Sequence, residues 1–272
     1  MTLIAIILAT LAAGIGSVWL AALLMRMGLG GRTDSVGPQH LLSLAAGALL
    51  ATAFMHLLPE AFESQAGAHD LFATLLIGVV FFFLLDKAEL WHHGHEHSHA
   101  APDPTLHAEH DHAHGHDHHH APRTGGWAVL TGDSVHCFGD GILIASAFMA
   151  DIRLGMIAAV SVLAHEVPHH MGDLVVLRQT SPNRRMALVK VSLAGAVTAL
   201  GGIVGYYLVG QLQDLLPYFL AVASSSFIYV ALADLIPQLQ KRLSARETVA
   251  QIAWLIAGMV IVTLVSGAAH AH

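Results

Sequence analysis

The stretch Ala164-His165-Glu166-Val167-Pro168-His169-His170-Met171-Gly172-Asp173 brings three histidines and two carboxylates together within nine residues. Apolar runs precede it from Met156 and follow it to Leu177, and together they predict one helix. Residues four apart share a helical face, so the His165–His169 pair and the Glu166–His170 pair each stack along the helix. Such a set is costly in lipid unless it faces a partner or a wet cavity, and ionisable groups in such a position indicate function.

The composition is that of a membrane protein. Of the 272 residues, 55% are hydrophobic and 11% charged, and the mean hydropathy is +0.61. Soluble globular domains carry about 25% charged residues. The single cysteine, Cys137, excludes internal disulfides and thiolate-rich zinc sites.

Eight segments are long enough to cross a hydrocarbon core of about 30 Å as helices. They lie near residues 2–25, 41–62, 70–90, 126–149, 154–177, 188–210, 216–238 and 248–268. The sequence therefore predicts an all-α polytopic membrane protein with eight transmembrane helices. We expect one membrane domain, with spans 1–3 in residues 1–91 and spans 4–8 in residues 126–272.

The basic residues predict the orientation. Eleven of the twelve lysines and arginines fall in the odd-numbered connections between spans. The positive-inside rule places these connections in the cytoplasm and both termini outside. Residues 92–125, between spans 3 and 4, hold thirteen histidines among acidic and small residues, so we expect a disordered, cytoplasmic loop that binds transition metals.

Spans 2 and 7 carry a matched pattern. His56-Leu57-Leu58-Pro59-Glu60 ends span 2, and Asp234-Leu235-Ile236-Pro237-Gln238 ends span 7. Proline-interrupted spans of opposite direction are typical of transporters built as inverted repeats. The pattern predicts that spans 1–3 and 6–8 are such a repeat around spans 4 and 5. It places His56 and Glu60 near the outer mouth of a pathway and Asp234 near the inner mouth.

Span 4 carries a second set of ligand-type residues, His136-Cys137-Phe138-Gly139-Asp140-Gly141. At about 1.5 Å per residue, His136 and His165 lie about 20 and 17 Å from the outer ends of their spans, near the midplane. We therefore expect His136, Asp140, His165 and His169 to surround one divalent ion, with Glu166 adjacent. This donor set suits Zn²⁺, and also Fe²⁺, Mn²⁺ and Co²⁺. Further candidates are His170, Asp173 and Cys137; the last points about 100° away from His136 and is either a ligand at an adjoining ion or a packing residue.

Three functions compete for these residues. His165-Glu166-Val167-Pro168-His169 matches H-E-x-x-H, the zinc and general-base motif of metalloproteases, which would make the chain an intramembrane protease. The His136–Asp140 pair matches the H-x-x-x-D pairs of cation exporters. The third candidate is a metal importer.

The two motifs resemble those of the ZIP family of zinc and iron permeases. His136 to Gly141 is similar to its H-N-x-x-D-G in span 4, and His165 to Asp173 to its H-E-x-P-H-E-x-G-D in span 5. The resemblance implies uptake of Zn²⁺, and in some members of Fe²⁺, Mn²⁺ or Cd²⁺, into the cytoplasm by a homodimer. It implies no enzymatic activity, no organic cofactor and no nucleic-acid partner, and we expect a bacterial inner membrane as the location. Cys137 replaces the family's asparagine, and His170 replaces a glutamate. Span 6 lacks the carboxylates that help hold a second ion in some relatives.

Overall fold

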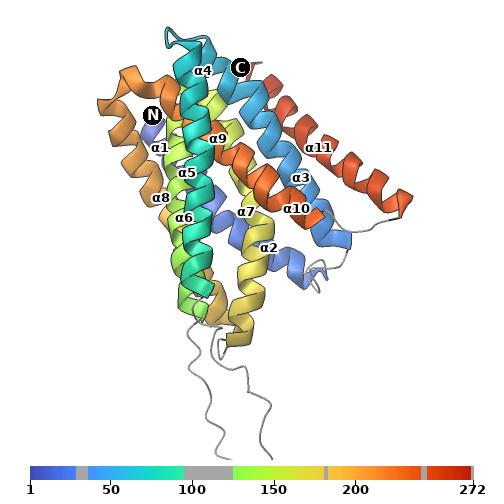
Figure 1. The fold of residues 1–272 in the computed structure, drawn as a ribbon. Helices are drawn as coiled ribbons and strands as arrows, with labels where there is room; N and C mark the ends of the chain where they lie inside the picture. Colours follow the sequence, from blue (N-terminus) through green and yellow to red (C-terminus); the bar gives the residue numbers. More distant parts are fainter. Residues whose placement is uncertain (29–35, 95–124, 181–182, 240–243, 271–272) are drawn as a thin grey trace, which may run out of the picture.

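The computed structural model describes residues 1–28, 36–94, 125–180, 183–239 and 244–270, and these contain helices but no strand. The predicted His-rich loop therefore lies outside the described residues, apart from its first residues at the end of one helix and its last residue at the start of the next. The all-α prediction is confirmed for the described part of the chain (Figure 1).

The described helices follow one another as eight rods. The third to sixth rods are single helices: α5 (Ala68–Gly94), α6 (Gly125–Ala150), α7 (Ile152–Thr180) and α8 (Arg184–Gln211). The first rod joins α1 (Thr2–Leu11), η1 (Ala12–Gly16) and α2 (Ser17–Arg26), and the second joins α3 (Val36–Thr52), η2 (Ala53–Leu57) and α4 (Leu58–Phe62). The seventh joins η3 (Gln213–Leu215), α9 (Leu216–Tyr229), η4 (Val230–Leu235) and α10 (Ile236–Leu239), and the last is α11 (Ala245–His270).

Six of these rods are long and apolar enough to cross a membrane, namely residues 2–26, 39–62, 68–85, 184–211, 213–239 and 245–265. The other two, α6 and α7, have 26 and 29 residues and are long enough, but both carry buried acidic side chains. Their low hydropathy reflects the polar cluster that they share. Eight membrane spans therefore stay a prediction, which the rod boundaries match closely.

α6 and α7 lie in the middle of the bundle. α6 packs against α7, α8 and α9, whereas α7 packs against α2 and α3. α5 lies on α9, and α11 lies on α3 (Figure 1). Only 11% of the apolar window of α5 and of α11 is buried, which suits helices that face lipid.

Glycines let the central helices approach closely. A Cβ atom added to Gly201 of α8 would lie 2.1 Å from the carbonyl oxygen of Phe138 in α6. One added to Gly141 of α6 would lie 2.0 Å from the carbonyl oxygen of Thr198. Small residues of this kind allow helix backbones to touch in a membrane, where packing rather than water exclusion drives association. These contacts hold α6 against α8 and so fix one wall of the site.

Two π-helical segments coincide with the matched pattern of spans 2 and 7. η2 contains His56 and is followed by Pro59, and η4 contains Asp234 and is followed by Pro237. Proline lacks the N–H that would bond to the carbonyl four residues earlier, and these carbonyls belong to Met55 and Ala233, inside the two segments. π-Helical turns occur frequently at functional sites.

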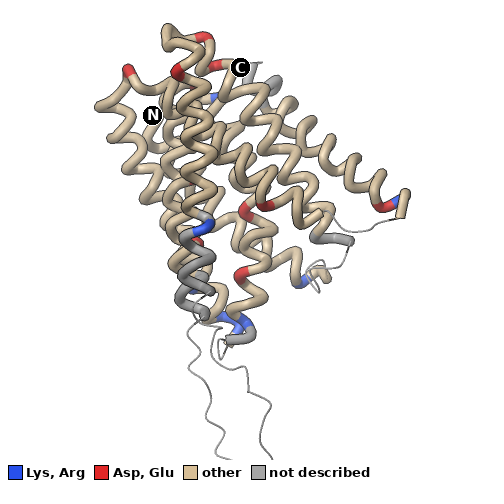
Figure 2. The backbone as a smooth tube through the Cα atoms, in the orientation of Figure 1, with Lys and Arg blue, Asp and Glu red and all other residues tan. Residues whose placement is uncertain are grey.

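Charged side chains are distributed unevenly along the bundle. Figure 2 shows most of the lysines and arginines of the described residues towards the end at which α6 begins and α7 ends. The start of α1 and the end of α11 lie towards the opposite end (Figure 1). Acidic residues occupy the middle of the bundle as well as its ends (Figure 2).

Candidate metal centre

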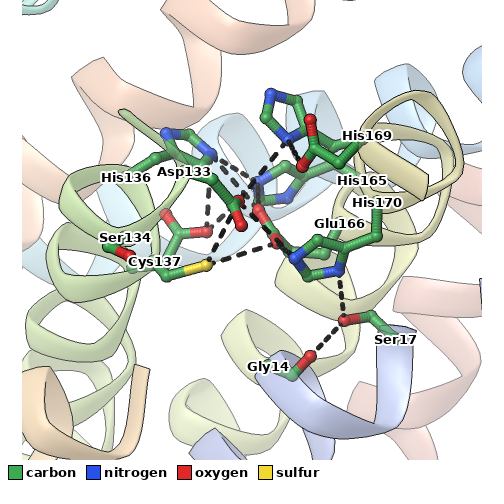
Figure 3. A network of polar contacts seen from close by, with 12 residues as sticks. Gly14, Ser17, Asp133, Ser134, His136, Cys137, His165, Glu166, His169 and His170 are labelled. Atoms are coloured by element: carbon green, nitrogen blue, oxygen red, sulfur yellow. Dashed lines mark hydrogen bonds and ion pairs between the residues drawn. The ribbon is translucent and has the colours of Figure 1, made fainter. Parts of the chain in front are cut away.

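Facing sides of α6 and α7 supply every residue of the polar cluster (Figure 3). The two helices form a hairpin in which only Asp151 lies between them, and its side chain accepts a hydrogen bond from the Arg153 N–H, which fixes the start of α7. On each helix the polar residues recur three or four positions apart and so share one face. They are Asp133, His136, Cys137 and Asp140 on α6, and His165, Glu166, His169, His170 and Asp173 on α7.

Four of these side chains form what we call the central cluster: His136, Asp140, His165 and Glu166. Nε2 of His165 lies 3.1 Å from Oδ2 of Asp140 and 3.4 Å from Oε1 of Glu166. Nε2 of His136 lies 3.3 Å from Nε2 of His165, 3.3 Å from the same Glu166 oxygen and 3.8 Å from the same Asp140 oxygen. Two imidazole nitrogens and two carboxylate oxygens therefore converge on one point.

The spacing of these atoms suits zinc. Donor atoms at about 2.05 Å from a tetrahedral zinc ion lie about 3.3 Å from one another. The five donor separations given above, out of six in the central cluster, run from 3.1 to 3.8 Å, and all six are within 4.8 Å. The four donors thus have the separations of a tetrahedral site.

A hydrogen bond sets the tautomer of His165. Its Nδ1 lies 3.2 Å from the carbonyl oxygen of Ser161, one turn earlier on α7. A carbonyl oxygen only accepts, so Nδ1 carries the proton and Nε2 presents a lone pair to the cluster. Metal-binding histidines are oriented in this way by a partner of the other ring nitrogen. The hydroxyl of Ser161 contacts that of Thr52, which ties this part of α7 to α3.

Burial makes the acidic groups of the cluster expensive without a cation. Asp140 is 2% exposed and Glu166 is 1% exposed. Oδ2 of Asp140 and Oε1 of Glu166 have no hydrogen-bond partner among the described residues. The described ion pairs of both residues involve histidines only, with neither lysine nor arginine. Buried charges in proteins are paired or coordinate metals, and the arrangement favours the second case.

His169 lies beside the central cluster rather than among its four donors. Its ring stacks on that of His136, with centroids 5.4 Å apart and planes at 24°. Nδ1 of His169 lies 3.7 Å from Oδ2 of Asp173 and 3.8 Å from Oδ1 of Asp133. The side chain of His169 is 40% exposed, so the group that it forms with Asp133 and Asp173 is more accessible to solvent than the central cluster.

Asp133 is a site residue that the motif analysis missed. It lies three residues before His136 and four before Cys137, and its side chain is 1% exposed. The available signal was the spacing itself: a carboxylate on the same helical face as two candidate ligands, inside an apolar segment. Cys137, which is fully buried, lies between Asp133 and Glu166, and His170 completes this second group.

The three predicted pathway residues lie apart from these groups. His56 is half-buried in η2, and its Nε2 has no hydrogen-bond partner among the described residues. Glu60 is exposed in α4. Asp234, in η4, accepts a hydrogen bond of 2.9 Å from the side-chain amide of Gln238. None of the three belongs to a group of metal-type ligands in the described part of the chain.

Comparison with known proteins gives one family. The family model described as "ZIP Zinc transporter" matches residues 1–266. The protein "Zinc transporter foi" of Drosophila melanogaster is 33% identical over 52% of this chain and 20% of its own length. "Zinc transporter ZIP4" of Homo sapiens is 36% identical over 42% of this chain and 18% of its own length. "Zinc transporter ZIP13" of Pongo abelii is 26% identical over 97% of this chain and 79% of its own length. The chain thus matches about a fifth of the length of the first two relatives.

Proposed function

Because this chain belongs to the ZIP family of zinc transporters, we propose that it carries Zn²⁺ through a membrane by way of the central cluster. The observation that supports this most is the convergence of four buried donors, His136, Asp140, His165 and Glu166, at tetrahedral spacing. The chain is an integral membrane protein, and the cluster lies in the part of it that the least apolar helices build. Zinc here is the substrate rather than a resident cofactor.

The protein groups assist passage by replacing the water shell of the ion. Two carboxylates supply charge, and two imidazoles supply neutral donors, so the ion is stabilised without thiolates that would hold it tightly. His136, whose side chain is 28% exposed, is the least buried member and the natural point of entry or release. The stacked ring of His169 leads from there towards Asp173. The same donors suit Fe²⁺ and Mn²⁺, and Cd²⁺ remains a further substrate to test.

We propose that the ion moves into the cytoplasm. The gathering of basic residues at one end of the bundle supports the placement of that end in the cytoplasm (Figure 2). Both termini would then lie outside, with residues 92–125 as a cytoplasmic loop between residues 1–91 and 126–272. On this orientation His56 and Glu60 belong to the outer half of the pathway, and Asp234 to the inner half. A homodimer in a bacterial inner membrane completes the proposal.

Matched helix contacts support the predicted inverted repeat. If span 2 corresponds to span 7 and span 3 to span 8, the contact of α3 with α11 corresponds to that of α9 with α5. If span 5 in turn corresponds to span 4, the contact of α3 with α7 corresponds to that of α9 with α6. The π-helical segments η2 and η4 occupy equivalent places under the same exchange. The inversion would give the pathway two halves that open to opposite sides.

Neither the family nor the geometry supports the protease alternative. In the H-E-x-x-H motif both histidines hold zinc and the glutamate stays free as a base. Here Glu166 is itself one of the four converging donors, and His169 instead lies nearest to Asp133 and Asp173. The cation-exporter alternative is replaced by the family assignment.

Zinc uptake into liposomes tests the proposed function. Purified protein is reconstituted into liposomes that contain a fluorescent zinc indicator. The rate of zinc uptake should saturate as external Zn²⁺ rises, and excess Cd²⁺ or Fe²⁺ should reduce it. Protein-free liposomes and liposomes with heat-denatured protein provide the background. Uptake no faster than this background, from protein that is monodisperse before reconstitution, would contradict the proposal.

Removal of the His-rich segment should leave transport largely intact. Deleting residues 95–120 retains all of α5 and removes most of the histidines of residues 92–125. The deleted segment is polar and rich in histidine, so we expect it to bind ions outside the membrane spans. Because the central cluster is unchanged in this variant, zinc uptake should persist. Calorimetry should show fewer Zn²⁺ ions bound per chain. A matched variant keeps the length and replaces these histidines by serine; an unchanged zinc stoichiometry in both variants would remove the buffering role.

A further inference from the structure

Two buried hydroxyl groups join α3 to α7 next to the central cluster. Thr52 is the last residue of α3, and Ser161 lies one turn before His165 on α7. Both side chains are fully buried, and their oxygen atoms are in hydrogen-bond contact. We call Thr52 and Ser161 the hydroxyl pair. The bond within this pair joins helices whose residues are more than a hundred positions apart in the sequence.

The hydroxyl pair is attached to one backbone group of α3. The Thr52 hydroxyl donates to the carbonyl oxygen of Ala48, one turn earlier, at 2.9 Å. The oxygen of Thr52 is then available to accept the proton of the Ser161 hydroxyl. The Ser161 oxygen also lies 3.5 Å from the same Ala48 carbonyl oxygen. Either hydroxyl therefore keeps a partner on α3 when the other hydroxyl is removed.

Small and apolar side chains surround the hydroxyl pair. Ala48 and Ala51 of α3, Ile157 of α7 and Val262 of α11 form one buried cluster, in which no member is more than 3% exposed. Contacts between such side chains are not directional, whereas a hydrogen bond away from water requires a defined geometry. Polar side chains that bond across helices hold those helices together in a membrane. The hydroxyl pair thus specifies how α3 and α7 meet.

The hydroxyl pair lies between His56 and the central cluster. His56 follows Thr52 by four residues, or about 6 Å, towards the outer end of span 2 in the proposed orientation. Span 5 runs in the opposite direction, so His165 follows Ser161 by the same distance towards the inner end. An ion that moves from the outer mouth to the central cluster must therefore pass the level of this pair.

The central cluster is closed on the side of the hydroxyl pair and more open on the other side. The His136 side chain is 28% exposed, and that of His169, one turn beyond His165, is 40% exposed. Four residues of α7 before His165 are at most 1% exposed, namely Ile157, Ala158, Ser161 and Val162. Entry from the outer mouth thus requires that the contact of α3 with α7 opens.

We propose that the bond between Thr52 and Ser161 is a latch that keeps the outer side of the central cluster closed and limits the rate at which zinc enters. The π-helical segment η2 begins directly after Thr52, so the backbone beside the latch departs from regular α-helical bonding. When the latch opens, Thr52 keeps its bond to Ala48, and a serine hydroxyl in a helix can bond to the carbonyl of its own preceding turn. This inference deepens the proposed function and rests on it.

A reversible cross-link tests whether α3 and α7 must separate. The variant Thr52→Cys/Ser161→Cys places two thiols where the hydroxyl oxygens are in contact, within reach of a disulfide, whose Cβ atoms lie about 3.5–4.5 Å apart. The full-length variant is oxidised with diamide, freed of the reagent and placed in liposomes, and its free thiols are counted in denaturant. Zinc uptake by the oxidised protein should be at least tenfold slower than after reduction with a phosphine.

The two single variants, Thr52→Cys and Ser161→Cys, are the controls for this experiment. Neither should respond to oxidation, and this result would also exclude a disulfide with Cys137, the only native cysteine. Equal uptake by the cross-linked and the reduced double variant would overturn the latch while leaving the proposed function in place. Wild-type protein without zinc uptake would instead reject the proposed function, and the latch with it.

Removal of a hydroxyl should have the opposite effect to the cross-link. Thr52→Val keeps the shape of the side chain, and Ser161→Ala removes only the oxygen atom. Each should raise the maximal rate of zinc uptake by about two- to tenfold, the rate equivalent of one hydrogen bond. Thr52→Ser retains the hydroxyl and should transport at the wild-type rate. The combined variant Thr52→Val/Ser161→Ala should gain no more than either single variant, because both changes remove the same bond.

Thr10→Val is the matched control for Thr52→Val. Thr10 is equally buried, and among the described residues its hydroxyl donates only to carbonyl oxygens of its own helix. A rate for Thr52→Val no higher than that for Thr10→Val would contradict the latch. Additive gains in the combined variant would show that the two hydroxyls act separately, and would contradict it as well.

Discussion

Replacing Glu166 by glutamine should reduce zinc uptake into liposomes by about 100-fold or more. Glutamine keeps the shape of the side chain, so the change removes charge rather than volume. It removes one carboxylate charge from the central cluster and turns an acceptor oxygen into an N–H₂ group that faces either His136 and His165 or His170. Loss of a partner outside the donor shell costs a metal site about 10- to 100-fold, and loss of a donor itself should cost at least as much.

The matched control for this variant is Glu247→Gln. Glu247 is half-buried near the start of α11 and bonds only to Ser244 among the described residues, so the same chemical change occurs away from the central cluster. Both variants should elute as the wild-type protein does in size-exclusion chromatography and melt at similar temperatures. Wild-type uptake by folded Glu166→Gln protein would show that the central cluster is not on the transport pathway.

Gly201→Leu should prevent stable packing of the central helices. The first atom of any side chain at Gly201 would lie 2.1 Å from the Phe138 carbonyl oxygen and 3.1 Å from the Phe138 Cα atom. These are backbone atoms of α6, so the clash is relieved only if α6 and α8 separate. Overpacking a core lowers the free energy of unfolding by about 1–3 kcal/mol, and a clash with backbone atoms should cost at least the upper end of that range. Thermal melting in detergent and the monodisperse fraction should both fall.

Gly210→Leu is the control on the same helix. Gly210 is exposed, and a Cβ atom placed on it meets nothing within 4 Å. This variant should melt close to the wild-type temperature and retain zinc uptake. Equal melting temperatures for the two leucine variants would mean that α6 and α8 do not rely on glycine contacts.

The helices and the pairing of the polar faces of α6 and α7 were predictable because strong local patterns specify both. Apolar length predicted rods that the structure reproduces to within a few residues, although α3 begins at Val36, five residues before the predicted position. The spacing of four residues predicted that His136 and Asp140 share a helical face. Counting residues from the helix ends predicted that His136 and His165 lie at the same depth in neighbouring helices. The contact of 3.3 Å between these two histidines follows from this match.

The rotation of α7 about its axis was not predictable from the motif. Glu166 and His169 differ by about 60° around the helix, and either could be the donor nearest to α6. The choice depends on packing by apolar neighbours such as Val167, Met171 and Leu174, which are buried against other rods. Motif reading favoured His169 as a fourth donor, whereas the structure brings Glu166 to that place. Asp133 lay just outside the motif in span 4, and its role depends on the same rotation.

The hairpin of α6 and α7 also has a consequence for the order in which the chain is made. All nine residues of the polar cluster lie between Asp133 and Asp173, and the two histidines in contact, His136 and His165, are 29 positions apart. The Ser17 hydroxyl, which lies 2.9 Å from Nδ1 of His170, and the Ser161 carbonyl, which lies 3.2 Å from Nδ1 of His165, are also synthesised before α8 begins. The donor set is therefore complete once the ribosome has passed Thr180. Such local contacts need the closure of only one short loop, so the later spans, as far as the structure describes them, build the surroundings of the proposed site and supply none of its four donors.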